Sequence, residues 1–431
     1  MGAPRVRFRI DLHPSEPLGR LVLNPRGEWV RAKNLPKSLS AAGLRSVWKT
    51  SRDSKTGSAG SPGVDRVSAV DFDKDLNAQL HRIREAIRYG YFSFKPLRVV
   101  PIPKKGGRTR LIAIPPVGDR LVQRALCNHL AHDSRFPKVP KVAYGFVAGR
   151  KLRDAHLAAA ALRTEAPWVL QTDIVSFFDE IPRAEVEAAV KKSVRSQIVS
   201  ELVIKAIRTE LDYTDPLTSK LATENGIKKG RGLRQGMPLS PLLSNLVMRP
   251  ADHALVAAKY RAIRYADDIA IFCSSRSECL EAFEAISELL KPLGLRLPQV
   301  EASGKTTITS PDEACELLGV EVRASPDGYV LCVPKGRADM VEKQLLDIST
   351  VEYCAEHKIG LSRMLAHYDA VIRGHKETAK SLEGADAFVA RLDAARSRAQ
   401  RALLISILGK GAVDNLTELK QAVLGLSPFP N

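Results

Sequence analysis

The fold of this chain is decided at residues 263–272, which read Ile-Arg-Tyr-Ala-Asp-Asp-Ile-Ala-Ile-Phe. Apolar, β-branched runs flank two adjacent acids, a pattern that predicts a strand, a tight turn and a second strand with Asp267 and Asp268 at the tip. Neighbouring carboxylates repel each other, and a hard divalent cation held by oxygen ligands is the usual way to offset them. An Asp-Asp pair in a loop is more often a solvated turn, but these flanks indicate a hairpin buried on both faces.

Two further segments belong with this hairpin. Residues 169–179 read Val-Leu-Gln-Thr-Asp-Ile-Val-Ser-Phe-Phe-Asp, an apolar strand that carries Asp173 and then a turn with two aromatic residues. Residues 232–246, Gly-Leu-Arg-Gln-Gly-Met-Pro-Leu-Ser-Pro-Leu-Leu-Ser-Asn-Leu, lie between the two acidic segments. We expect Asp173, Asp267 and Asp268 to converge on one pair of magnesium ions.

In this order the three segments resemble the motifs of reverse transcriptases, and residues 234–245 are similar to a motif of the bacterial branch of that family. The resemblance implies an α+β, right-hand polymerase fold with fingers, a ferredoxin-like palm and a helical thumb. The implied domains are a basic N-terminal extension (1–50), fingers (51–165), a palm (166–333, with a finger-like helical insertion at 182–230) and a thumb (334–431).

The composition is that of a soluble globular protein large enough for two or three domains. Hydrophobic residues make up 44% of the 431 residues and charged residues 26%. No apolar run approaches the roughly 20 residues that a membrane span needs, and the N-terminus lacks the apolar core of a secretory signal. The six cysteines form no metal-binding or paired pattern, which favours free thiols in the cytoplasm.

Positive charge is concentrated in the first third of the chain. Residues 1–150 carry 29 Lys and Arg against 11 Asp and Glu, whereas the remaining residues carry 37 of each. The whole net charge of +18 therefore lies in residues 1–150. Such asymmetry indicates contact with a polyanion, although a basic surface that serves solubility would give the same total.

The resemblance also assigns roles at the catalytic centre. Asp173 and Asp267 would bind two Mg²⁺ ions, with Mn²⁺ as an alternative, helped by Asp268 and the backbone carbonyl of Ile174. Such a pair would activate the primer 3′-hydroxyl and hold the triphosphate. Phe178 stands where the family places a steric gate against the ribose 2′-hydroxyl; its alternative role is core packing, which we expect of at least one of the two phenylalanines.

Other residues are expected to hold the nucleotide, the template and the primer. Residues 97–115 predict a hairpin with a basic turn that is similar to the fingers hairpin of the family. Its Lys104, Arg108 and Arg110 would grip the triphosphate and the template backbone, unless the turn is simply solvated. The resemblance also implies that Gln235 contacts the nucleotide or the template strand and that Lys305 protonates or neutralises the leaving pyrophosphate. The expected template and primer contacts are Tyr144, Phe146, Arg150, Gly236, Leu318 and Gly319. For Tyr144 and Phe146, packing in the core is the alternative.

The implied activity is RNA-directed DNA synthesis, with an RNA template, deoxynucleoside triphosphates and a DNA product. A polymerase fold that has lost catalysis and binds a structured RNA is the alternative from another class. Among the enzymes, the retron signature Val-Thr-Gly is missing, and the Asn-Ala-X-X-His match at residues 77–81 precedes Asp173. The lack of sequence for a domain after the thumb disfavours a mobile intron enzyme. These points favour a stand-alone enzyme that copies a partner non-coding RNA in antiviral defence, with a homo-oligomer or a companion protein left open.

Overall fold

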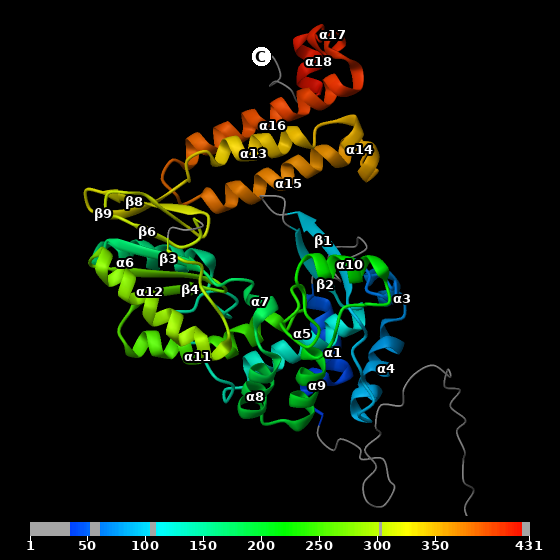
Figure 1. The fold of residues 1–431 in the computed structure, drawn as a ribbon. Coiled ribbons are helices and arrows are strands. Elements are labelled where there is room, and N and C mark those ends of the chain that lie inside the picture. The colour runs from blue at the N-terminus through cyan, green and yellow to red at the C-terminus, as the bar shows by residue number, and fades with distance from the viewer. Residues whose placement is uncertain (1–34, 52–60, 104–108, 301–303, 425–431) are drawn as a thin grey trace, which may run out of the picture. The chain divides into compact units, whose positions relative to one another are not determined.

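The computed structural model describes residues 35–51, 61–103, 109–300 and 304–424 (Figure 1). The chain divides into two compact units: unit 1 comprises residues 1–139, 176–250 and 292–295, and unit 2 comprises residues 140–175, 251–291 and 296–431. This division cuts across the predicted boundaries, because residues 176–250 of the predicted palm fall in unit 1 and residues 140–165 of the predicted fingers fall in unit 2. The division into fingers, palm and thumb stays a prediction.

Unit 1 is mainly helical, with one two-stranded sheet. Its elements are η1 (Lys37–Leu39), α1 (Ala41–Thr50), α3 (Ala69–Lys74), α4 (Leu76–Arg88), β1 (Arg98–Pro103), β2 (Thr109–Ile114), α5 (Val117–His132), α7 (Phe177–Glu180), α8 (Arg183–Ser193), α9 (Gln197–Ile207) and α10 (Pro216–Glu224). Helix α11 (Ser240–Ala257) passes from unit 1 into unit 2.

The predicted basic hairpin is confirmed as far as it is described. Strands β1 and β2 pair antiparallel from Arg98 opposite Ile114 to Pro103 opposite Thr109. The turn residues Lys104 and Arg108 lie outside the described residues, and Arg110 is exposed on β2. The apolar spacing of residues 71–89 predicts one amphipathic helix. The structure has two helices there, α3 and α4, because the backbone of Asp75 leaves the helical conformation between them.

Pro238 suits the first turn of a helix and so predicts a helix that begins at Gln235, but α11 begins at Ser240 instead. Gly236 has a φ of +105°, which a right-handed helix excludes. The Ser240 hydroxyl donates a hydrogen bond of 2.8 Å to the Arg234 carbonyl and so closes the preceding turn. Residues 235–239 therefore form an irregular loop before α11, not the first turn of the helix.

Unit 2 contains two sheets and a group of helices. Its elements are α6 (Leu152–Glu165), β3 (Trp168–Asp173), β4 (Arg261–Tyr265), β5 (Asp268–Cys273), α12 (Arg276–Leu290), η2 (Lys291–Leu293, shared with unit 1), β6 (Thr307–Thr309), β7 (Cys315–Leu317), β8 (Val320–Ser325), β9 (Gly328–Cys332), α13 (Arg337–Asp347), α14 (Val351–His357), α15 (Leu361–Ala379), α16 (Ala385–Leu408), α17 (Lys410–Asp414) and α18 (Glu418–Val423).

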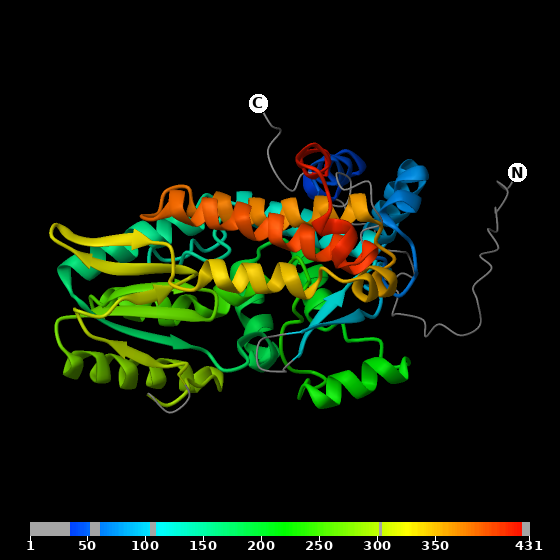
Figure 2. The ribbon, with the colours of Figure 1, turned by 90° about the horizontal axis from the view of Figure 1, so that it is seen from above.

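The larger sheet has the strand order β4-β5-β3-β6, with every neighbouring pair antiparallel. This is the order of a ferredoxin-like sheet, as predicted. Side chains alternate between the faces of a strand: Val169 and Phe272 pack with α6 and the β7–β9 sheet, whereas α12 packs on β3 and β5 from the other face (Figure 2). The hairpin around the two acids is thus buried on both faces, as its apolar sequence predicts.

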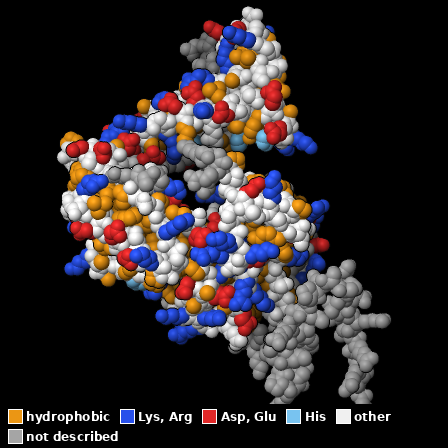
Figure 3. Space-filling view, in the orientation of Figure 1, with side chains coloured by type: hydrophobic (Ala, Val, Ile, Leu, Met, Phe, Trp, Pro, Cys, Tyr) orange, Lys and Arg blue, Asp and Glu red, His pale blue; other side chains and the backbone are white. Residues whose placement is uncertain are grey.

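The helices after residue 334 pack around a core of their own. Met364, Tyr368 and Leu392, from α15 and α16, are completely buried there, and the core extends to Val320 of β8. Over these helices Lys and Arg side chains are interspersed with Asp and Glu (Figure 3). All six cysteines are free, as predicted. No helix in the described part of the chain is long and apolar enough to cross a membrane.

Candidate active site

The three acids singled out in the sequence lie together at one end of the larger sheet. Asp173 is the last residue of β3 and stands opposite Asp268, the first residue of β5. The Ile174 N–H donates a hydrogen bond of 3.1 Å to the carbonyl of Asp267, which is in the turn. The antiparallel register of β3 with the β4–β5 hairpin therefore brings together residues almost a hundred positions apart.

The electrostatics of the acids are those of crowded carboxylates. Burial raises the pKa of Asp267 to about 7, and the charge of Asp173, together with a hydrogen bond between these two side chains, adds to the rise. Burial also raises the pKa of Asp268 to about 6, again with a contribution from Asp173. Each carboxyl therefore resists ionisation until a cation approaches.

Lys305 supplies one such cation. Its ammonium lies 3.2 Å from Oδ2 of Asp173 and lowers the pKa of Asp268. The neighbouring Thr306 is completely buried, and its hydroxyl hydrogen-bonds the Thr172 hydroxyl at 2.8 Å. Strand β6 then pairs with β3. Lys305 is thus held beside Asp173 by the next residue and the next strand, and its role at the pyrophosphate stays a prediction.

The donor set suits a hard divalent cation. Carboxylate and carbonyl oxygens are the ligands of Mg²⁺, which usually binds through one or two carboxylates and the substrate phosphates, not inside a cage of protein side chains. Among the described residues, no group of three or more His, Cys, Asp or Glu side chains is placed so that it could hold a metal ion. Asp173, Asp267, Asp268 and the carbonyl of Ile174 remain the predicted ligands.

A buried ion pair supports the acidic turn from beneath. Arg264 is 1% exposed and Asp252, on α11, is completely buried. The Arg264 guanidinium donates from Nε and Nη2 to the two oxygens of Asp252, each at 2.7 Å, and from Nη1 to the carbonyl of Ala266 at 2.9 Å. Ala266 has a φ of +59°, a conformation that is uncommon for residues other than glycine. The hydrogen bond from Arg264 to the carbonyl of Ala266 holds the turn in this conformation.

The segment 142–150, which carries the predicted template contacts Tyr144, Phe146 and Arg150, also braces this turn. The N–H of Arg264 donates to the carbonyl of Val142 at 2.7 Å, and that of Tyr144 donates to the carbonyl of Arg264 at 2.8 Å. A Cβ on Gly145 would lie 2.6 Å from the backbone nitrogen of Ala266, so only glycine fits there.

The aromatic and basic side chains of this segment differ in their surroundings. Tyr144 packs against the core, in line with its alternative role, and the guanidinium of Arg150 lies 5.3 Å from its ring centroid. That guanidinium also donates to the carbonyls of Pro140 and Lys141, so it stabilises its own segment. Phe146 is 51% exposed, and its ring centroid lies 6.2 Å from that of Tyr265; its contact with a base stays a prediction.

The remaining predicted nucleotide contacts lie in unit 1. Phe177 is buried and Phe178 half-buried, and their rings meet edge to face at 5.3 Å. The carbonyl of Phe178 accepts a hydrogen bond from Leu233 at 2.6 Å, and the carbonyl of Gln235 accepts one from Ala113 on β2 at 2.7 Å. The loop that carries Gln235 is therefore held between the predicted gate residue and the basic hairpin.

Gly236 has a packing role at this loop. A Cβ there would lie 2.4 Å from the carbonyl oxygen of Ala113. Gly236 therefore makes the predicted close backbone approach, and it makes it to β2. The contact of Gly236 with template or primer stays a prediction.

Beneath the same loop, two buried arginines share one carboxylate. Arg183 and Arg234 are 7% and 2% exposed. Both donate to Glu210, at 2.6 and 2.9 Å, and Arg183 also donates to the carbonyl of Gly232 at 2.9 Å. Among the described residues, buried donors remain without a partner on both arginines and on Tyr213. This cluster fixes residues 228–235.

Sequence reasoning missed both arginine clusters. The signal for Arg264 was a charged residue inside an apolar strand, because such a residue must be paired when it is buried. Arg183 and Glu210 lie in no pattern that would have signalled their burial. Leu318 and Gly319, the predicted primer support, form the turn between β7 and β8 with positive φ values of 52° and 82°.

Comparison with known families gives the same assignment as the acidic motifs. The family model described as "Reverse transcriptase (RNA-dependent DNA polymerase)" matches residues 102–322, just over half of the chain. The chain belongs to the reverse transcriptase family. Its α+β architecture is accordingly the predicted right-hand polymerase fold.

Individual members of the family are distant. Protein YkfC of Escherichia coli is 30% identical over 207 residues, which cover 46% of this chain and 50% of YkfC. The group II intron-encoded protein LtrA of Lactococcus lactis is 23% identical, covering 53% of this chain and 35% of LtrA. The retron Ec73 reverse transcriptase of Escherichia coli is 26% identical, covering 46% of this chain and 60% of that protein. The matched region thus spans about half of YkfC and a third of LtrA.

Proposed function

We propose that this chain is an RNA-directed DNA polymerase that adds deoxynucleotides to a primer 3′-hydroxyl in the cytoplasm. The observation that carries the proposal is the meeting of Asp173, Asp267 and Asp268 at the end of one sheet, with Lys305 beside them. A structural RNA-binding protein would have no use for three adjacent carboxylates, two of which, Asp267 and Asp268, have pKa values raised by burial and by the charge of Asp173. A polymerase would use the negative charge of these carboxylates to hold its metal ions.

Each residue has a defined part in the proposed reaction. A pair of Mg²⁺ ions, or Mn²⁺ in their place, would supply activation of the 3′-hydroxyl and charge stabilisation on the triphosphate. Asp173 and the turn acids would hold that pair, and Lys305 would move from Asp173 to the departing pyrophosphate. Phe178 would exclude the 2′-hydroxyl, and the loop at Gln235 would position the base and sugar.

Primer extension on an RNA template tests the catalytic assignment. The double variant Asp267→Ala, Asp268→Ala should bind the template–primer duplex like the parent and incorporate no nucleotide. Asp312→Ala, which removes an exposed acid of the same unit, is the matched control and should extend normally. Synthesis by the double variant would end the proposal.

Sugar selection tests the gate. The variant Phe178→Ala should incorporate ribonucleotides while its kcat/KM for deoxynucleotides changes little, because removing the ring opens space only beneath the 2′ position. An unchanged preference for deoxynucleotides would remove Phe178 from the site and leave the polymerase assignment intact.

We further propose that the template is a partner non-coding RNA and that the product acts in antiviral defence. Sequencing of the nucleic acid that copurifies with the protein tests this step. One abundant RNA, encoded beside the protein and joined to complementary DNA, is the expected result. Recovery of intron RNA would replace the defence role with one in a mobile element.

A further inference from the structure

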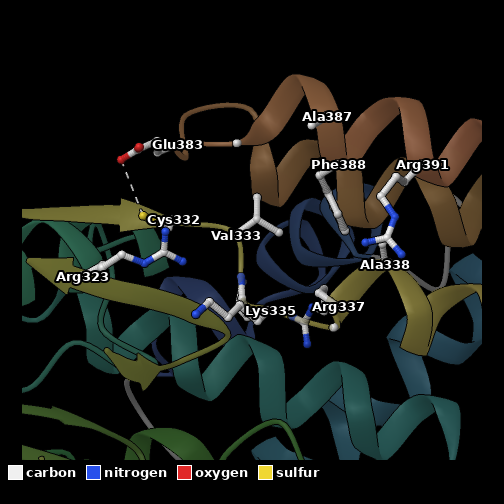
Figure 4. A pocket seen from close by; sticks show the side chains of 13 residues that line it. Arg323, Cys332, Val333, Lys335, Arg337, Ala338, Glu383, Ala387, Phe388 and Arg391 are labelled. Atoms are coloured by element: carbon white, nitrogen blue, oxygen red, sulfur yellow. Dashed lines mark hydrogen bonds between the residues drawn. The ribbon is translucent and has the colours of Figure 1, made fainter. Parts of the chain in front are cut away.

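A basic pocket lies where the β7–β9 sheet meets the helices that follow it in unit 2. Its volume is about 300 Å³. Its apolar floor includes Val333, Ala338 and Phe388, and Figure 4 shows charged side chains around that floor. The Cys332 thiol, on its upper side, donates to the Glu383 carboxylate. The pocket is lined by residues of unit 2 alone, and the three acids are not among them.

Four cationic side chains line the pocket: Arg323, Lys335, Arg337 and Arg391. Arg323 pairs with Glu321 and Arg391 pairs with Asp339. Within the described residues, the side chains of Lys335 and Arg337 have neither an ion pair nor a hydrogen bond, and Glu383 is the one acid of the lining. The pocket therefore carries an excess of positive charge without a partner inside the protein.

The backbone adds donors to the same place. Helices α13 and α16 both begin at the pocket, after Gly336 and Gly384, and neither has a side chain that caps its first turn. Unpaired N–H groups and the positive end of the helix dipole favour an anion at such positions. Two helix starts and four cations from separate segments thus surround one cavity.

We propose that this pocket binds a phosphate group of a polynucleotide backbone. Guanidinium and ammonium groups that approach from several directions suit the oxygens of a phosphate. A nucleic-acid strand is favoured over a free nucleotide because Arg337 reaches beyond the pocket: its Nη2 lies 3.1 Å from the position that a Cβ on Gly319 would take. The turn at Gly319 is the predicted primer support. The identity of the strand thus rests on the proposed function, whereas phosphate binding does not.

Binding measured over a range of salt concentrations tests the proposal on the full-length protein. Fluorescence anisotropy with a labelled RNA–DNA duplex, without nucleotides, gives affinity between about 50 and 200 mM salt, where each lost phosphate contact lowers the slope of log K against log salt by about 0.9. Lys335→Ala and Arg337→Ala should each weaken binding about three- to tenfold and lower the slope by about 1. Both variants should melt like the parent, because neither side chain has a protein partner.

Lys343→Ala is the matched control, since it removes an exposed lysine of the same helix that does not line the pocket. Equal slopes for the parent, the control and both pocket variants would overturn the proposal, as would an equal loss in the control. A second measurement adds inorganic phosphate or a deoxynucleoside monophosphate. If the monophosphate alone binds the pocket and the duplex does not compete with it, the pocket takes a free nucleotide and the strand is excluded. Because no synthesis is measured, a chain that fails to extend a primer can still pass this test.

Discussion

Two buried arginine clusters, one in each unit, differ in how completely their charges are matched. Beneath the acidic turn, one arginine faces one carboxylate, and Nε, Nη1 and Nη2 of Arg264 all donate to named oxygens. Beneath the loop of Gln235, Arg183 and Arg234 share Glu210, and donors remain without partners among the described residues. The first cluster fixes its turn before any ligand arrives. The second holds residues 228–235 while part of its own hydrogen-bonding capacity stays unused.

The largest effect is expected from breaking the matched pair. Asp252→Asn leaves the guanidinium of Arg264 buried with no countercharge and should cost about 3–5 kcal/mol of unfolding free energy. Urea unfolding measures it. The double variant Asp252→Leu, Arg264→Met should recover most of the stability but extend primers poorly, because the hydrogen bond to Ala266 is lost. A cost below about 1 kcal/mol for Asp252→Asn would show that the pair is not the support described.

The two close backbone approaches give the next effect. Gly145→Ala forces a Cβ against Ala266, and Gly236→Ala forces one against Ala113 in a backbone conformation that disfavours it. Each substitution should lower the free energy of unfolding by about 1–3 kcal/mol through overpacking. In primer extension Gly145→Ala should mainly lower kcat, because it displaces the acids, whereas Gly236→Ala should mainly raise KM for the nucleotide. The same kinetic change in both variants would contradict the separation of the two regions.

A smaller effect is expected at the shared carboxylate. Glu210→Gln keeps the shape of the side chain but removes its charge. Because the cluster already contains donors without partners, the free energy of unfolding should fall by only about 1–2 kcal/mol. KM for deoxynucleotides should rise and selection against ribonucleotides should fall, because the loop at Gln235 loosens. Glu187→Gln, which breaks an ion pair with Arg208 in the same unit, is the control and should leave sugar selection unchanged.

The smallest expected effect is a gain in stability. Burial and the charge of Asp173 raise the pKa of Asp267 to about 7 in the folded protein, from 3.8 for an unperturbed aspartate. Between these values the unfolded chain loses its proton first, so stability falls as pH rises from about 4 to about 7. Asp267→Asn should therefore stabilise the protein by about 1–2 kcal/mol at pH 8 and by nothing near pH 4. Thermal unfolding at the two pH values measures the difference. A gain of the same size at both would mean that charge is not its cause.

The centre of the site could be predicted from the sequence because its information is local. An acid at the end of one apolar strand and two acids in a hairpin turn must meet if the strands pair, and Asp173 indeed lies opposite Asp268. The expected role of Lys305 came from the family resemblance. The family resemblance supplied the order of the segments, which strand periodicity alone does not give.

What could not be predicted depends on partners distant in the chain. Asp252 faces Arg264 across a helix and a strand, and Glu210 reaches Arg183 and Arg234 from another loop; no spacing encodes either contact. The predicted start of α11 was wrong because Pro238 suits a first helical turn, while the carbonyl of Ala113 that excludes a Cβ at Gly236 is invisible in the sequence. The break at Asp75 was missed because the apolar periodicity continues across it.

The walls of the basic pocket belong to two different elements: Arg323 projects from the β7–β9 sheet and Arg391 from α16. Gly336 and Gly384, both with positive φ, mark the ends of the segments that lead into α13 and α16. Any swing of these helices against the sheet must change the separation of the two arginines. If the pocket binds an anion as proposed, anion binding favours one angle between the helices and the sheet. By the same linkage, any contact that stabilises that angle raises the affinity of the pocket for the anion.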